Sequence, residues 1–181
     1  MSISIPIPER ELYDSENNKF IDIPKTVLVL EHSLISISKW ESKWHKSYLS
    51  TPKKTKEEEL DYIRCMTISS NVSPEAYYAL TRRDVKLIES YMNDPMTATT
   101  ISNNKVKNNR DIITSELIYY WMTELGIPFQ PCEKWHINRL LMLIEVCSLK
   151  RQKPKNMSPA AIARQNHALN AARRAKHHSR G

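Results

Sequence analysis

The chain has 181 residues, 40% of them hydrophobic and 26% charged, with a net charge of +7. This composition excludes a disordered chain and is typical of one folded domain. Because the only glycines are Gly126 and Gly181, a glycine-rich phosphate-binding loop is excluded, and with it P-loop and dinucleotide-binding functions.

The sequence contains no stretch of 18 consecutive hydrophobic residues, so we expect no transmembrane helix. The first residues, MSISIPIPERE, lack the basic and apolar regions of a signal peptide. We therefore expect a cytoplasmic protein, in which three cysteines without close pairing stay reduced.

The charge is unevenly distributed along the chain. Residues 146–181 hold nine Lys and Arg residues and no acid, whereas residues 1–145 hold 18 basic and 20 acidic residues. A cationic block of this kind is typical of an interaction arm for an anionic partner, either nucleic acid or an acidic protein surface.

Residues 1–29 alternate apolar and polar side chains and are interrupted by Pro6, Pro8 and Pro24. Since proline confines strands to sheet edges, we expect an extended arm with one or two short edge strands. Whether the arm reaches a neighbouring subunit or lies on its own domain stays open.

The next segments predict four helices. Helix spacing of apolar residues predicts a helix over 30–44, in which Trp40 and Trp44 are either core anchors or an apolar partner-binding patch. A capping box at Thr55 predicts a helix to about residue 68, and Ser73 with Pro74 predicts a short one over 74–80. Thr81 caps a fourth helix, with an expected inner stripe of Val85, Ile88 and Met92.

Residues 93–110 are polar and unpatterned, which predicts a long surface loop. The segment 111–150 is the most apolar of the chain and predicts two helices joined at Gly126 and Pro128. The inner face expected for these helices consists of Ile113, Leu117, Tyr120, Trp121, Leu125, Trp135, Leu140, Leu141, Leu143, Ile144 and Cys147.

After a linker over 151–157, Ser158 and Pro159 predict the start of a last helix that ends near Lys176. This helix is rich in alanine and has little to bury, so we expect it to fold against a partner. Its candidate contacts for an anionic partner are Arg164, Arg173, Arg174 and Lys176.

These elements predict a mainly α fold: a single-domain helical bundle around the central hairpin of 111–150. The expected parts are an extended N-terminal arm over 1–29, a helical domain over 30–150, and a linker with a basic C-terminal helix over 151–181.

We find no pattern that indicates catalysis, a cofactor or a metal site. Cys132 and His136 lie four residues apart, but two ligands fall short of a structural zinc site, so a buried thiol and a hydrogen-bonded core histidine are favoured. Glu116 and Glu145 are candidate buried carboxylates, more typically paired with a base such as Arg139 than catalytic. The basic tail lacks interleaved aromatic residues, so any nucleic-acid binding is expected to be nonspecific.

Several strings carry a family resemblance: LEHSLISISKWESKWHKSYL (30–49), DYIRCMT (61–67), MTATT (96–100), ELIYYWMTELGIPF (116–129), WHINRLLMLIEVCSLK (135–150) and LNAARRAKHHSRG (169–181). Together they resemble small proteins encoded among the structural genes of tailed bacteriophages, most closely those called tail assembly chaperones.

The resemblance implies a non-enzymatic helical protein in the host cytoplasm. Such chaperones coat the tape measure protein and help tail-tube subunits assemble around it, so the implied partners are phage tail proteins, with no membrane involved. Homo-oligomerisation stays open. The alternative is a structural virion component of head, neck or tail that uses the basic tail to contact DNA or an acidic protein surface.

Overall fold

A computed structural model of the chain describes residues 1–14, 18–101, 112–151 and 159–177. The chain divides into two compact units, Met1–Ser148 and Leu149–Gly181. The first unit contains four strands, β1 (Ile3–Ile7), β2 (Arg10–Asp14), β3 (Lys19–Ile23) and β4 (Thr26–Leu30), followed by helices. The helices are α1 (Leu34–Trp44), α2 (Lys56–Met66), the 3₁₀ helix η1 (Pro74–Ala79), α3 (Arg82–Asn93), α4 (Ser115–Leu125), α5 (Phe129–Cys132), α6 (Ile137–Arg151) and, in the second unit, α7 (Pro159–His177).

The four strands form one bent antiparallel ribbon. β1 pairs with β4 and β2 with β3, and the same register continues through both pairs, from Ile3 opposite Leu30 to Asp14 opposite Lys19. The pairing is interrupted where Pro8 and Pro24 fall, because proline donates no hydrogen bond to a ladder. The ribbon therefore consists of an inner half, β1–β4, and an outer half, β2–β3.

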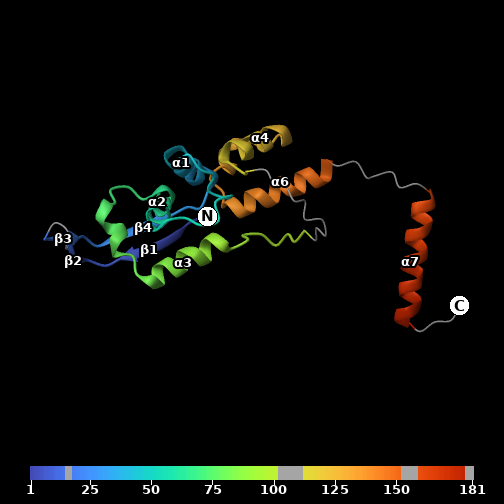
Figure 1. Cartoon of the computed structure of the whole chain (residues 1–181), viewed down its shortest axis with the longest axis horizontal. Coiled ribbons are helices and arrows are strands. Elements are labelled where there is room, and N and C mark those ends of the chain that lie inside the picture. Colours follow the sequence, from blue (N-terminus) through green and yellow to red (C-terminus); the bar gives the residue numbers. More distant parts are fainter. Residues whose placement is uncertain (15–17, 102–111, 152–158, 178–181) are drawn as a thin grey trace. The chain divides into compact units, whose positions relative to one another are not determined.

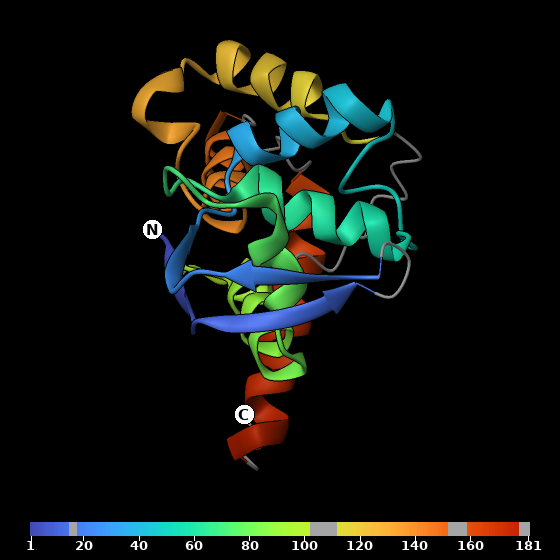
Figure 2. The same cartoon turned by 90° about the vertical axis from the view of Figure 1, so that its left-hand side faces the viewer.

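The inner half of the ribbon belongs to the core of the first unit. Ile5, Ile7 and Leu28 are buried on one of its faces. In Figures 1 and 2 the ribbon runs between α2 on one side and α3 on the other, and α1 lies beyond α2 beside α4. The chain after α2 adds to the edge of β4, where the Ile68 N–H donates to the Val29 carbonyl at 2.8 Å.

This arrangement corrects the predicted fold class. The protein is a mixed α/β structure and not a mainly α bundle with an extended N-terminal arm. The prolines of residues 1–29 favoured an arm, but the alternating isoleucines bury one face of a ribbon. Pro8 and Pro24 fall at the bend of this ribbon, and Pro6 lies on its exposed face. Leu30, assigned to the first helix, ends β4, and α1 begins only after Ser33, whose hydroxyl accepts the Ser36 N–H.

The segment 111–150 is not the centre that we expected. Its two helices are present, and Gly126 ends α4 in the left-handed conformation with φ 68°, which confirms that boundary. The fully buried residues of α4, however, are Ser115, Ile118 and Met122, whereas Tyr120 is 57% exposed. The buried core extends instead across the ribbon, α1, α2 and α6.

Other helix signals are confirmed. Thr55 and Thr81 each form a complete capping box, with Glu58 and Asp84, and Pro159 opens α7. In α3 the inner stripe differs from the expected one, because Ile88 and Tyr91 are buried and Val85 is 37% exposed. The predicted loop and linker lie partly outside the described residues, at 102–111 and 152–158.

Candidate functional site: a cleft and a cationic helix

The expected anionic-partner residues lie on α7. The side chains of Arg164, Arg173 and Arg174 are exposed, and Leu169 on the same helix is 49% exposed. Lys176 is part of the helix, but its side chain lies outside the described residues. Arginine side chains and one apolar side chain of α7 are therefore exposed.

The two candidate tryptophans differ in accessibility. Trp40 is fully buried, and its indole N–H donates to the Glu58 carbonyl at 2.9 Å. Trp44 stacks on Trp40, is half-buried, and donates its indole N–H to Asp61 at 2.8 Å. Trp40 is thus a core anchor that an apolar partner does not reach, and only Trp44 retains exposed surface.

The interface of α1 and α2 holds buried charges that sequence reasoning missed. Glu58 and Asp61 are 2% and 6% exposed, yet each is paired: Lys46 contacts Glu58 at 2.6 Å and Lys43 contacts Asp61. The hydrogen bond from Lys46, together with the Thr55 N–H, lowers the pKa of Glu58. These acids are structural, because both are satisfied by partners on the neighbouring segment.

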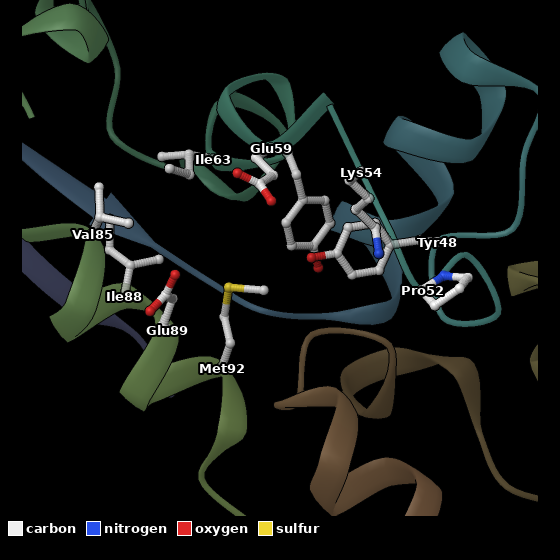
Figure 3. A pocket seen from close by; sticks show the side chains of 10 residues that line it. Tyr48, Pro52, Lys54, Glu59, Ile63, Val85, Ile88, Glu89 and Met92 are labelled. Atoms are coloured by element: carbon white, nitrogen blue, oxygen red, sulfur yellow. The ribbon is translucent and has the colours of Figure 1, made fainter. Parts of the chain in front are cut away.

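A cleft of about 200 Å³ lies between the loop after α1, helix α2 and helix α3 (Figure 3). Its apolar lining comes from Ile63, Ile88 and Met92. Figure 3 shows the carboxylates of Glu59 and Glu89 facing the cleft from α2 and α3 respectively. The cleft therefore combines an apolar floor with an acidic group on either side.

Two stacked tyrosines form the end of the cleft. The rings of Tyr48 and Tyr62 are 3.7 Å apart between centroids, and the Lys54 ammonium lies 4.2 Å from the Tyr48 ring. Burial raises the pKa of both phenols and lowers the pKa of Lys54. Both phenols are therefore neutral near pH 7, and Lys54 is held over an aromatic face by a cation–π contact.

A buried histidine pair lies behind Tyr62. The Tyr62 hydroxyl and His32 Nδ1 are hydrogen-bonded at 2.6 Å, and the His32 and His136 rings are 5.0 Å apart between centroids. His136 Nδ1 accepts the Asn138 N–H, so Nε2 donates to the Tyr91 carbonyl at 3.0 Å. This confirms the interpretation of His136 as a hydrogen-bonded core histidine.

Burial determines the charge of this pair. Desolvation, reinforced by His136, lowers the pKa of His32 to about 3, and desolvation also lowers the pKa of His136. Both rings are therefore neutral at neutral pH, and for His136 this agrees with the Asn138 N–H that its Nδ1 accepts. Cys132 is buried, which confirms its interpretation as a buried thiol.

The other candidate groups are dispersed. Among the residues that the structure describes, no three His, Cys, Asp or Glu side chains converge as metal ligands would. Glu116 is exposed on α4, and Glu145 is half-buried on α6. Arg139 lies over the Trp135 ring at 4.4 Å. None of the described helices has the length and apolar character needed to cross a membrane.

The cleft was not predictable from local patterns, because α3 lines it together with α2 and the loop before α2, from which α3 is separated by η1. Comparison of the chain with protein-family models, with curated proteins and with solved structures finds no match. The evidence for function therefore consists of the resemblance in the sequence and the geometry described above.

Proposed function

We propose that this chain is a non-enzymatic bacteriophage tail assembly protein that acts as a chaperone through contacts with tape measure or tail-tube subunits in the host cytoplasm. The observation that carries the proposal is α7, a basic helix with exposed arginines in a unit separate from the folded body. A helix that has little apolar surface to bury gains stability mainly from a partner. Its arginines favour a partner with an acidic surface.

The cleft supports the same proposal from the folded body. Its volume of about 200 Å³ is smaller than the roughly 300–1,000 Å³ typical of small-molecule sites and suits one or two side chains of a protein partner. Met92 adapts its shape to an apolar side chain, while Glu59 and Glu89 suit basic residues that flank it. A partner helix with an apolar residue between basic residues meets both requirements.

Quantitative mass spectrometry of infected-cell lysates and of purified particles tests the assembly role. A chaperone is abundant in lysates and absent from finished particles. A fixed copy number per particle contradicts the proposal and supports the alternative, a structural virion component that contacts DNA or an acidic protein surface.

Affinity capture of the phage's tape measure and tail-tube proteins tests the role of α7. The variant R164Q/R173Q/R174Q/K176Q should capture less of them than the unaltered chain. The matched control, K53Q/K56Q/R82Q/K86Q, removes four exposed charges from the body and should capture as much as the unaltered chain. Equal loss in both variants would indicate nonspecific electrostatic attraction.

A further inference from the structure

The outer half of the ribbon carries an exposed aromatic pair. Tyr13 on β2 lies directly opposite Phe20 on β3, with 5.1 Å between the ring centroids. The two side chains are 55% and 61% exposed. Contiguous aromatic surface of this kind on a folded protein is characteristic of an interaction site.

The burial of the core does not account for this pair. Side chains alternate between the two faces of a strand, so Leu12 and Ile21 lie on the face opposite Tyr13 and Phe20. That opposite face packs on the protein, since Leu12 joins the core and Ile23 is fully buried. The aromatic face is therefore surplus to the core.

The neighbouring pair on the aromatic face is acidic. Glu11 lies directly opposite Asp22, and both are exposed beside a hollow of about 470 Å³. Like charges placed opposite one another destabilise an antiparallel pair, and a bound cation relieves their repulsion. A cationic partner that also contacts aromatic rings therefore fits this face.

The chain itself contains a segment with this chemistry. Residues 9–22 hold five acids and two bases, whereas α7 holds four bases and no acid. Arginine is the base best suited to the face, because its guanidinium pairs with carboxylates and also stacks on aromatic rings. The exposed Arg173 and Arg174 supply two such guanidinium groups for the carboxylates of Glu11 and Asp22.

We infer that α7 of one copy binds the aromatic and acidic face of β2–β3 on a second copy. The inference rests on the proposed function in taking α7 as the protein-binding helix, and it names the acidic surface that the helix recognises. The two surfaces differ, so the contact is head-to-tail and builds a ring or a filament. Such an array places many copies along one long partner.

Sedimentation velocity of the full chain, over a range of concentrations, tests the inference. We expect the unaltered chain to self-associate and the assembly to weaken at high salt, because the contact is electrostatic. The variants E11K/D22K and R173E/R174E should each raise the dissociation constant of self-association by about tenfold or more. Combining the two reversals in one chain should restore assembly, since opposite charges then meet again.

Two controls separate this contact from general effects of substitution. E57K/E116K reverses two exposed acids elsewhere in the body and should assemble as the unaltered chain does. Y13A/F20A should weaken assembly, whereas Y120A, which removes another exposed tyrosine, should not. Circular dichroism establishes that each variant is folded.

A chain that remains monomeric at about 100 μM overturns the inference. The inference is also overturned if E11K/D22K and R173E/R174E both assemble as the unaltered chain does, or if combining them in one chain does not restore assembly. These outcomes are independent of the proposed function, because the experiment contains no tail protein. Conversely, failure to capture tail proteins would leave a charge-dependent self-association intact.

Discussion

The carboxylate of Glu41 on α1 accepts the backbone N–H of Ser115, the first residue of α4, at 2.7 Å. Its second oxygen accepts the Tyr48 N–H at 2.8 Å. Glu41 is 8% exposed, so one buried acid joins α1, the loop that carries the tyrosine wall of the cleft, and the start of α4. A negative charge at this position also interacts favourably with the N-terminal end of the α4 dipole.

Replacing Glu41 should therefore destabilise the protein, because its carboxylate accepts two backbone N–H groups from separate segments. Glu41→Gln removes the charge and turns an amide N–H₂ toward one of the two donors, and we expect a loss of about 2 kcal/mol, as for a charged hydrogen bond. Urea unfolding monitored by tryptophan fluorescence measures the change. The control Glu116→Gln alters an exposed acid in the first turn of α4 and should cost less than about 1 kcal/mol. Equal losses would show that Glu41 acts only through the helix dipole.

The buried histidines should make stability depend on pH. The pKa of His32 is lowered from 6.5 to about 3 in the folded protein, so between these values the unfolded chain binds a proton that the folded chain does not. The contribution of neutral His32 to the free energy of unfolding is therefore fully present above pH 6.5, and it is lost progressively as the pH falls toward 3. His136, whose pKa is also lowered, acts in the same direction. We expect His32 to account for a loss of about 1 kcal/mol between pH 7.5 and 5.5.

Urea unfolding at these two pH values tests this linkage above the range in which Asp and Glu titrate. His32→Asn should lower stability overall but flatten its pH dependence. The control His45→Asn alters an exposed histidine at a left-handed backbone position, which asparagine also tolerates, and should keep the slope of the unaltered chain. An unchanged slope in His32→Asn would contradict the assignment of the proton to His32.

Local sequence signals predicted most helices because their causes are local. The capping boxes at Thr55 and Thr81, the left-handed Gly126 and the opening Pro159 each act within one helical turn. The ribbon depended on pairings between residues up to 27 positions apart, such as Ile3 with Leu30. Prolines in both strands obscured that pairing. The apolar residues of 116–125 lie on several sides of α4, so hydrophobicity alone could not predict which side faces the core. The hydrogen bond from the Ser115 N–H to Glu41 fixes the start of the helix against α1.

The cationic helix was visible in the sequence, but the cleft was not. A block without acids is evident from composition alone. The stacking of Tyr48 on Tyr62 depends on how the loop after α1 returns to α2, and the acids Glu59 and Glu89 resemble ordinary solvated helix positions. The signal that could have located the buried face of α1 was the pair of tryptophans, for which the sequence left open a core position or a partner-binding patch.

The two tryptophans should differ sharply in their contribution to stability. Trp40→Ala removes a fully buried side chain and its bond to the Glu58 carbonyl, so we expect a loss of about 3–5 kcal/mol. Trp44→Ala removes a half-buried ring and should cost less than half as much. Chemical denaturation followed by circular dichroism measures both without relying on tryptophan emission. Similar losses would show that Trp44 is equally part of the core and leave no role for it at a partner surface.

The charges of α7 should contribute little to the stability of the body. Neutralising Arg164, Arg173, Arg174 and Lys176 removes charges that are solvated where their side chains are described, and exposed charges are worth roughly 0–1 kcal/mol each. The variant R164Q/R173Q/R174Q/K176Q should therefore melt within a few degrees of the unaltered chain, by scanning calorimetry at a dilution where assembly is negligible. At higher concentration the unaltered chain alone should gain stability with concentration, because association favours the folded state by mass action. A large loss of melting temperature at high dilution would show that α7 contributes to the folded body itself, in which case its arginines are structural and not free for a partner.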